Sequence, residues 1–318
     1  MSALIAVENL SKHFGTIRAV DDISMAVAKG EVLGFLGPNG AGKSTTMKMV
    51  AGFLTPTAGR AWVAGIDVVA DPVAAKRQLG YLPEGAPSYG DMTPAGFLDF
   101  VAAVRGFDGA ERQSRVDQVV EKVAIADVLH QPIDTLSKGY KRRVGLAQAL
   151  VHDPEVLIMD EPTDGLDPNQ KHQVRTLIHD MAADKAVVIS THILEEVEAV
   201  CNRAVVIARG RLLADGTPHD LLARSRLHNA VRIELDAATL DGARQALSGI
   251  AGVDAVEELA GVNGTRALRV IPKDGRPIAV AVGAVLSANG IETHDMYTEK
   301  GALDEVFRQI TTGVAADA

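Results

Sequence analysis

Short apolar runs alternate with stretches of helical periodicity along the chain up to about residue 222. Strands and helices that alternate in this way form a mostly parallel sheet covered by helices, which predicts an α/β fold. The valine and isoleucine content of the runs is typical of strands buried on both faces. The predicted strands are Ala3–Val7, Ile23–Val27, Val32–Leu36, Ala61–Ala64, Leu79–Leu82, Val156–Met159, Val187–Ser190 and Ala204–Ala208.

One stretch, at about residues 91–152, has no strand pattern and predicts only helices. Thr93 followed by Pro94 is typical of a helix start, because Thr can cap a helix and Pro fits its first turn. We expect this helix to end at Gly106. Its predicted apolar stripe is Phe97, Leu98, Val101 and Val104. A helical subdomain is therefore predicted as an insertion into the α/β domain of residues 1–222.

A second pattern follows residues 223–229, which are interpreted as a linker. Four strand patterns and two amphipathic helices come in the order β-α-β-β-α-β, which is typical of a ferredoxin-like fold. Residues 230–318 are therefore predicted to form a small C-terminal α+β domain with an accessory or regulatory role. The expected strands lie near Val231–Leu235, Val253–Glu257, Ala267–Ile271 and Ile291–His294, and a last helix is expected over Gly301–Ile310.

The composition excludes several classes of protein. Hydrophobic residues make up 47% of the 318 residues, which excludes a disordered or fibrous chain. The net charge of −9 argues against a nucleic-acid binder, which would carry a basic surface. The single cysteine, Cys201, allows no internal disulfide, and no apolar run reaches the roughly 18 residues of a membrane span. We expect a soluble, cytoplasmic chain without a nucleic-acid partner, and any membrane spans would belong to another polypeptide.

A glycine-rich loop follows the apolar run Val32–Leu36 and precedes a helical pattern. It has the spacing G-x-x-x-x-G-K-[ST], in which backbone N–H groups cradle phosphates at a helix N-terminus. Lys43 can reach the β- and γ-phosphates, and the Ser44 hydroxyl can ligate Mg²⁺. The chain is therefore predicted to bind a nucleoside triphosphate. The loop consists of Gly37, Pro38, Asn39, Gly40, Ala41, Gly42, Lys43, Ser44 and Thr45.

Two carboxylates, Asp160 and Glu161, follow the strand Val156–Met159. Ligands bind at the carboxyl ends of strands in open parallel sheets. Because a strand alternates its faces, the two side chains are expected to have different roles. We expect Asp160 to hold Mg²⁺, directly or through water, and Glu161 to polarise the attacking water.

Ser137 precedes a helical pattern that runs to about His152. A serine here can cap the helix and leaves N–H groups free for an anion. The charged run Lys141–Arg143 on this helix is interpreted as a solvated face or as charge near a phosphate, in preference to a nucleic-acid patch.

These motifs and their order resemble the ATP-binding cassette (ABC) ATPases, the nucleotide-binding subunits of transporters. Residues 37–45 match the Walker A loop, and residues 156–161 match the Walker B strand with its catalytic glutamate. Asp164–Asp167 resembles the D-loop, and His192 the switch histidine. Phe14 stands where the family stacks an aromatic ring on adenine. The segment similar to the family signature is Leu136, Ser137, Lys138, Gly139 and Tyr140.

The sequence departs from the family pattern at two places. Glu84 stands at the position of the usual lid glutamine, and it can still ligate Mg²⁺ or orient water. In the signature, Lys138 replaces a glycine and Tyr140 a glutamine, whereas Ser137 and Gly139 are retained. These two departures and the small C-terminal domain resemble the ATP-binding subunits that pair with ABC-2-type permeases. That resemblance favours export over import.

The resemblance implies a P-loop NTPase core that hydrolyses ATP with Mg²⁺ held by Ser44, Asp160 and, as a further candidate, Glu84. It implies that Glu161 and His192 are catalytic. It also implies a second copy of the chain, whose Ser137 and Gly139 cover the ATP and whose Asp167 makes a contact across the dimer. An integral membrane permease would hold the dimer at the inner face of the cell membrane.

Two alternatives stay open at this point. The chain could be a soluble cassette ATPase that acts on nucleic acid or ribosomes, although the long coiled-coil insertion or second cassette of such proteins is absent from the sequence. It could also be a regulatory nucleotide switch whose C-terminal domain senses a ligand.

Overall fold

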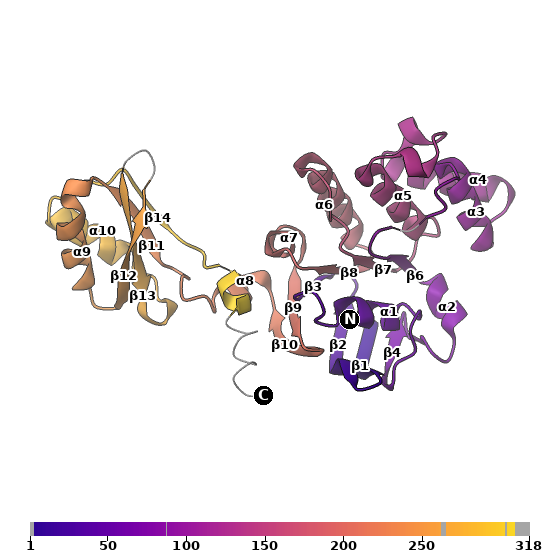
Figure 1. The fold of residues 1–318 in the computed structure, drawn as a ribbon, viewed down its shortest axis with the longest axis horizontal. Coiled ribbons are helices and arrows are strands. Elements are labelled where there is room, and N and C mark those ends of the chain that lie inside the picture. The colour runs from indigo at the N-terminus through magenta and orange to yellow at the C-terminus, as the bar shows by residue number, and fades with distance from the viewer. Residues whose placement is uncertain (1–2, 87, 262–264, 303, 309–318) are drawn as a thin grey trace. The chain divides into compact units, whose positions relative to one another are not determined.

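The computed structural model of the chain describes residues 3–86, 88–261, 265–302 and 304–308. The chain folds into two compact units, Met1–Asp215 (unit 1) and Gly216–Ala318 (unit 2), each with a buried core (Figure 1). Unit 2 starts before the stretch interpreted as a linker, and Ser225 in that stretch is buried and donates a hydrogen bond to Glu305. The domain boundary at residue 222 stays a prediction.

A six-stranded sheet runs through unit 1 in the order β10-β9-β3-β8-β7-β6. Its strands are β3 (Val32–Leu36), β6 (Leu79–Leu82), β7 (Val156–Asp160), β8 (Ala186–Thr191), β9 (Arg203–Ala208) and β10 (Arg211–Gly216). The pairs β3–β8, β3–β9, β6–β7 and β7–β8 are parallel, as the sequence predicts. Because these strands run in one direction, the carboxyl ends of β3, β7 and β8 meet at one edge of the sheet.

Three predicted strands belong to a different sheet. The strands β1 (Ala3–Phe14), β2 (Ile17–Ala28), β4 (Ala58–Val63) and β5 (Ile66–Asp67) form a second sheet in the order β2-β1-β4-β5, with antiparallel pairs. Placing the first two predicted strands and the fourth in the parallel sheet was therefore wrong. The turn at Gly15 and Thr16 is too short for the crossover that parallel strands need.

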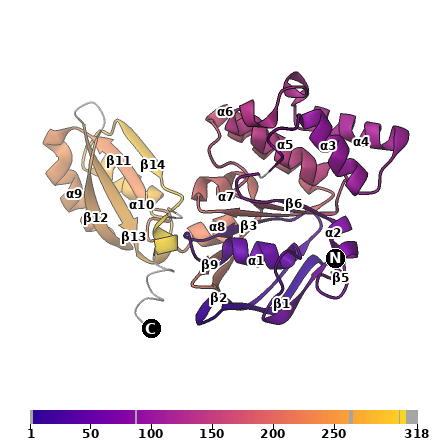
Figure 2. The ribbon, with the colours of Figure 1, turned by 45° about the vertical axis from the view of Figure 1, so that its right-hand side comes forward.

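Helix α1 (Lys43–Val50) lies between the two sheets in both views of the ribbon (Figures 1 and 2). Its buried Met47 and Val50 join a core cluster that includes Phe35 of β3, Ile158 of β7 and Ile5 of β1. The other helices of the α/β part are α2 (Pro72–Arg77), α6 (Pro168–Ala182) and α7 (Leu194–Val200).

Between β6 and β7 the described residues form helices and no strand. The helices are α3 (Pro94–Val104), α4 (Gly109–Lys122) and α5 (Lys138–Leu150), with short 3-10 turns at Ala126–Val128 and Ile133–Thr135. Thr93 accepts a hydrogen bond from the Gly96 N–H and caps α3, as predicted. Phe97 and Leu98 are buried, but Val104 is 70% exposed, so its place in the buried stripe was wrong.

Unit 2 begins with α8 (Pro218–Leu222) and continues as β11 (Val231–Leu235), α9 (Leu240–Ser248), β12 (Val253–Ala260), β13 (Arg266–Pro272), α10 (Ala279–Ala288) and β14 (Asp295–Thr298), with 3-10 turns at Ala237–Thr239 and Lys273–Gly275. The sheet order is β12-β13-β11-β14, and its pairs are antiparallel. The last strand lies later than the predicted Ile291–His294. Residues 304–308 are helical, and the rest of the expected final helix includes positions outside the described residues. The ferredoxin-like classification of this unit stays a prediction.

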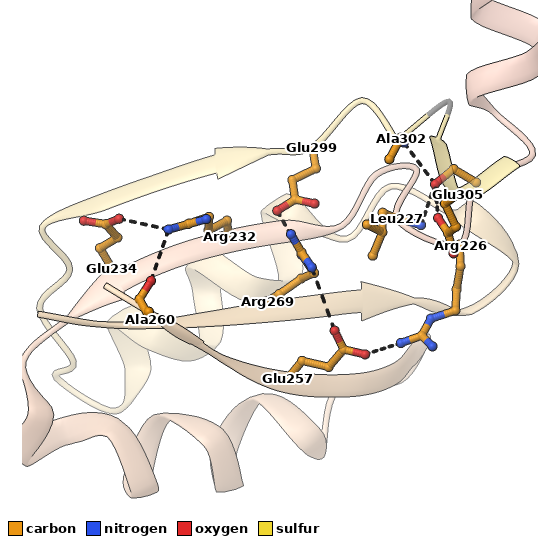
Figure 3. Close-up of polar contacts among 11 residues, drawn as sticks. Arg226, Leu227, Arg232, Glu234, Glu257, Ala260, Arg269, Glu299, Ala302 and Glu305 are labelled. Carbon is orange, nitrogen blue, oxygen red and sulfur yellow. Dashed lines mark hydrogen bonds and ion pairs between the residues drawn. The ribbon is translucent and has the colours of Figure 1, made fainter. Parts of the chain in front are cut away.

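One face of this sheet is charged. Val231, Ile233 and Leu235 of β11 pack with α9 and α10, so the residues between them point to the opposite face. There Arg232 contacts Glu234 and the Ala260 carbonyl, and Arg269 contacts Glu299 and Glu257 (Figure 3). The Arg269 ion pairs connect β13 with β12 and with the segment after β14, and the Arg232 hydrogen bond to Ala260 connects β11 with β12.

Candidate functional site

A cavity of about 430 Å³ lies over the glycine-rich loop between β3 and α1. Gly40 and Gly42 both have left-handed backbones, with φ of 80° and 106°. A Cβ on Gly42 would stand under 3.0 Å from the Ala19 carbonyl oxygen, so only glycine fits there. The cavity is lined by Ala19, Pro38, Asn39, Gly40, Ala41, Gly42, Lys43, Ser44, Thr45, Glu84 and Glu161.

Lys43 is 5% exposed and bonds back to its own loop. Its Nζ donates to the carbonyl oxygens of Gly37 at 2.7 Å and Pro38 at 3.3 Å. Burial lowers the pKa of Lys43 from its ordinary value, while the nearby carboxylates, with Glu161 the strongest, oppose that shift. The ammonium group is thus held at the loop, beside the carboxylates of the site.

Asp160 ends β7 and is 1% exposed. Its Oδ1 accepts a hydrogen bond from the Ser190 hydroxyl, which sits opposite it in the register of β7 and β8. Its Oδ2 is buried and has no hydrogen-bond partner. A buried carboxylate oxygen without a partner is costly unless a cation or water completes it.

That orphaned oxygen fits a magnesium ion. Mg²⁺ takes one or two protein ligands and fills its other positions with water and phosphate oxygens. Ser44, on the loop, supplies a hydroxyl in the same cavity as Glu84. Among the described residues no group of three or more His, Cys, Asp or Glu side chains could hold a metal alone.

Glu161 and His192 face each other at the end of β7 and β8. The Glu161 Oε1 and His192 Nδ1 atoms are 2.8 Å apart. Glu161 has a left-handed backbone with φ of 49°, and its N–H donates to the Ser190 carbonyl at 3.0 Å. Alternation along a strand predicts different faces for Asp160 and Glu161, but β7 ends at Asp160, so Glu161 is not part of the strand. The left-handed turn, not strand alternation, aims Glu161 into the cavity.

The segment that carries Glu84 packs against α5. Leu82 and Ala86 flank Glu84 in the sequence, and a Cβ on Gly145 of α5 would stand under 3.0 Å from both of their side chains. Arg142, one turn earlier on α5, is 6% exposed, and its Nη1 has no hydrogen-bond partner. Burial lowers its pKa, and four carboxylates oppose that shift, namely Asp164, Glu161, Glu84 and Asp160 in decreasing order. Of the two interpretations of Lys141–Arg143, the solvated face is wrong for the buried Arg142, and charge near a phosphate stays a prediction.

The signature residues do not line this cavity. Ser137 caps α5 and accepts from the Tyr140 N–H at 3.4 Å. Leu136 is buried, and the Tyr140 hydroxyl bonds to Asp127. Gly139 packs against Gln170, since a Cβ there would stand under 3.0 Å from that side chain. Lys138 lies against Gly165 in the segment after Glu161.

Asp167 and Phe14 also lie outside the cavity lining of the described residues. Asp167 caps α6 and forms a capping box with Gln170. Phe14 ends β1 at the hairpin tip, is 48% exposed and has the Lys12 ammonium 5.3 Å from its ring. Its exposure excludes a role as a core residue.

The loop, the acidic strand end and the capped helix together define a P-loop nucleotide-binding unit. The ABC transporter family profile matches residues 20–164. The chain belongs to this family of ATP-binding subunits and carries its ATPase domain.

Known proteins of this family are similar to the chain over different lengths. It is 32% identical to the daunorubicin resistance ATP-binding protein DrrA3 of Streptomyces coeruleorubidus, over 96% of this chain and 95% of that protein. It is 38% identical to the probable multidrug ABC transporter ATP-binding protein YbhF of Escherichia coli over 70% of this chain, but spans only 38% of YbhF. A solved ATP-binding subunit of an ABC transporter matches 69% of the chain with a TM-score of 0.64 and 31% identity.

Proposed function

We propose that the chain binds MgATP on the Gly37–Thr45 loop and hydrolyses it to drive export through a membrane permease. The observation that carries the catalytic part is the Glu161–His192 contact beside the loop cavity. The carboxylate accepts a proton from the attacking water, and His192 orients that carboxylate and contacts the γ-phosphate.

The phosphates occupy the nest formed by the glycines of the loop, at the N-terminus of α1. Lys43 exchanges its bonds to Gly37 and Pro38 for bonds to phosphate oxygens, which costs little because one set of acceptors replaces another. Asp160 and Ser44 hold the magnesium ion, with Glu84 a further candidate. When bound, Mg²⁺ supplies positive charge that stabilises the charge developing on the phosphates.

The working unit is a dimer of this chain. Ser137 and Gly139 stand at the N-terminus of α5 and line no part of the chain's own loop cavity. A second copy would bring these N–H groups and the Ser137 hydroxyl onto the ATP. In that assembly Asp167 makes a contact across the dimer, and Phe14 stacks on adenine.

An apolar surface on unit 1 supports the proposal of a permease partner. Two adjoining cavities of about 480 and 400 Å³ share Phe53, Tyr81 and Phe100 as lining residues. Phe53 and Phe100 are 63% and 45% exposed, and exposed aromatic patches of this kind mark binding surfaces. We propose that a cytoplasmic segment of the permease binds this groove, which lies between the core and α3.

Several observations bear on the transporter type and location. None of the helices in the described ranges is long and apolar enough to cross a bilayer. Relatives of the chain are named for daunorubicin resistance and multidrug transport. We propose an exporter of the ABC-2 type, with this chain held at the cytoplasmic face by the permease. The apolar groove favours this over a nucleic-acid or ribosome-associated ATPase and over a free regulatory switch.

The Glu161→Gln variant tests the catalytic proposal. It should retain ATP binding and slow turnover by roughly 10²–10⁴-fold, about 3–5 kcal/mol on the barrier, because glutamine cannot accept the proton. Steady-state ATPase rates and nucleotide affinity of variant and parent are compared. Equal turnover rates would refute Glu161 as the base.

A further inference from the structure

A buried carboxylate lies behind the Glu161–His192 pair and takes no part in the chemistry proposed above. Glu196, on α7, is 5% exposed. Its Oε1 accepts a hydrogen bond from the Thr163 hydroxyl, and its Oε2 accepts one from the Thr191 hydroxyl at 3.2 Å. Lys171 of α6, which packs beside α7, places its Nζ 3.5 Å from Oε1.

The two threonines belong to the two segments that carry the catalytic pair. Thr191 directly precedes His192, and its Oγ1 also accepts from the Ile193 N–H at 3.0 Å, on the other side of His192. Thr163 lies in the turn after Glu161, where the Asp164 N–H donates to the Glu161 carbonyl at 3.2 Å. Both threonines are almost fully buried, with Thr163 at 3% and Thr191 at 1% exposure.

The strand pairing between β7 and β8 stops just before the catalytic pair. The paired register of β7 and β8 ends at Asp160 and Ser190. Beyond that pair the Glu161 N–H still donates to the Ser190 carbonyl, but Glu161 has a left-handed backbone and lies outside β7. Thr191 ends β8 and is paired with Leu36 of β3. Glu196 acts where the β7–β8 pairing stops, because one of its oxygens binds the turn after β7 and the other binds the last residue of β8.

We propose that Glu196 is a positioning residue that sets the distance between Glu161 and His192 by bonding both segments at once. This inference rests on the proposed catalytic role of Glu161. The two threonine hydroxyls and the Lys171 ammonium satisfy the buried carboxylate, which would otherwise be costly in this position.

The test compares Glu196→Gln with Glu198→Gln in the full chain. Glu198 lies on the same helix and is exposed, so the same substitution there controls for the loss of one charge from α7. The Glu196 variant should lose roughly 10–100-fold in kcat, the range for hydrogen-bond partners that orient metal ligands, with KM for ATP within about twofold of the parent. The control should keep both constants.

Two further variants separate positioning from packing. Thr191→Val removes the hydroxyl and keeps the shape, whereas Thr191→Ser keeps the hydroxyl. If Glu196 acts through Thr191, the valine variant reproduces the loss of kcat and the serine variant does not. Equal rates for the two would overturn the proposal.

Combination with Glu161→Gln decides whether Glu196 acts through the base. Single-turnover rates should fall no further when Glu196→Gln is added, since the positioned group is already gone. Multiplied losses would show that Glu196 acts elsewhere and overturn the inference. A Glu161→Gln variant that turns over like the parent refutes the proposed function itself. A slow Glu161→Gln beside a normal Glu196→Gln refutes the positioning role alone.

Discussion

Replacing Gly42 with alanine should destabilise unit 1 and disrupt nucleotide binding far more than the same change at Gly40. Gly42 has φ of 106°, and the added Cβ would stand under 3.0 Å from the backbone oxygen of Ala19. At Gly40, with φ of 80°, the Cβ would meet nothing within 4 Å. The two positions thus share a left-handed backbone that is unfavourable for alanine, and only Gly42 lacks space for a Cβ.

The expected magnitudes follow from that difference. Alanine in a left-handed conformation costs about 1–2 kcal/mol, and this is the whole expected cost of Gly40→Ala. At Gly42 the overlap with a backbone atom adds about 1–3 kcal/mol, because no side-chain rotation can relieve it. Gly42 also accepts hydrogen bonds from the Thr46 N–H and hydroxyl at 2.9 Å, so its displacement moves the start of α1. ATP affinity should fall with it.

Urea unfolding followed by tryptophan fluorescence measures this cost. Trp62 is the single tryptophan of the chain and lies on β4, so the signal reports unit 1. ATP affinity is measured on the same samples by titration. Equal unfolding free energies for the Gly40 and Gly42 variants would refute the steric argument for the loop.

Three further predictions concern the site and its partners. Arg142→Gln should lower ATPase activity, because it removes the buried positive charge that lies near four carboxylates. Adding Glu84→Gln removes one of those negative charges and should restore part of the activity. A double-mutant cycle on kcat should give a coupling of about 1–2 kcal/mol, and additive losses would contradict the pairing. Ser137→Ala in one subunit of a mixed dimer should impair hydrolysis at the ATP held by the other loop, whereas a defect in the altered subunit's own loop site would contradict the shared site. Phe100→Glu should abolish capture of the membrane permease from solubilised membranes without changing ATP affinity. Val280→Glu, at an exposed valine of unit 2, is its control, and equal capture by both would exclude the groove.

Much of the fold could be read from the sequence because its signals are local. The ends of β3 and β6 lie where the apolar runs predict them, and Thr93 and Ser137 cap their helices as their positions indicate. The antiparallel sheet was missed because valine-rich runs look alike in both kinds of sheet. Only the short turn after Phe14 distinguishes them.

Burial on a helix was harder to predict than the helix itself. Val104 continues the apolar stripe of α3 but lies at its exposed end, and Arg142 lies in a charged run but faces the interior. A periodic pattern gives the face of a helix, whereas the depth of each position depends on what packs against it. For Arg142 the surrounding carboxylates, with Asp164 the strongest, all lie on segments outside α5.

The sequence by itself determined the phosphate loop, since its nest is built from consecutive residues whose glycines meet a local backbone requirement. It also determined which side chains could bind a metal or accept a proton. The tertiary structure alone decided how those side chains meet. The 2.8 Å contact of Glu161 with His192, the free oxygen of Asp160 and the bonds of Glu196 join residues from separate strands and helices. Such contacts depend on sheet register and on the turn after β7, which no local pattern specifies.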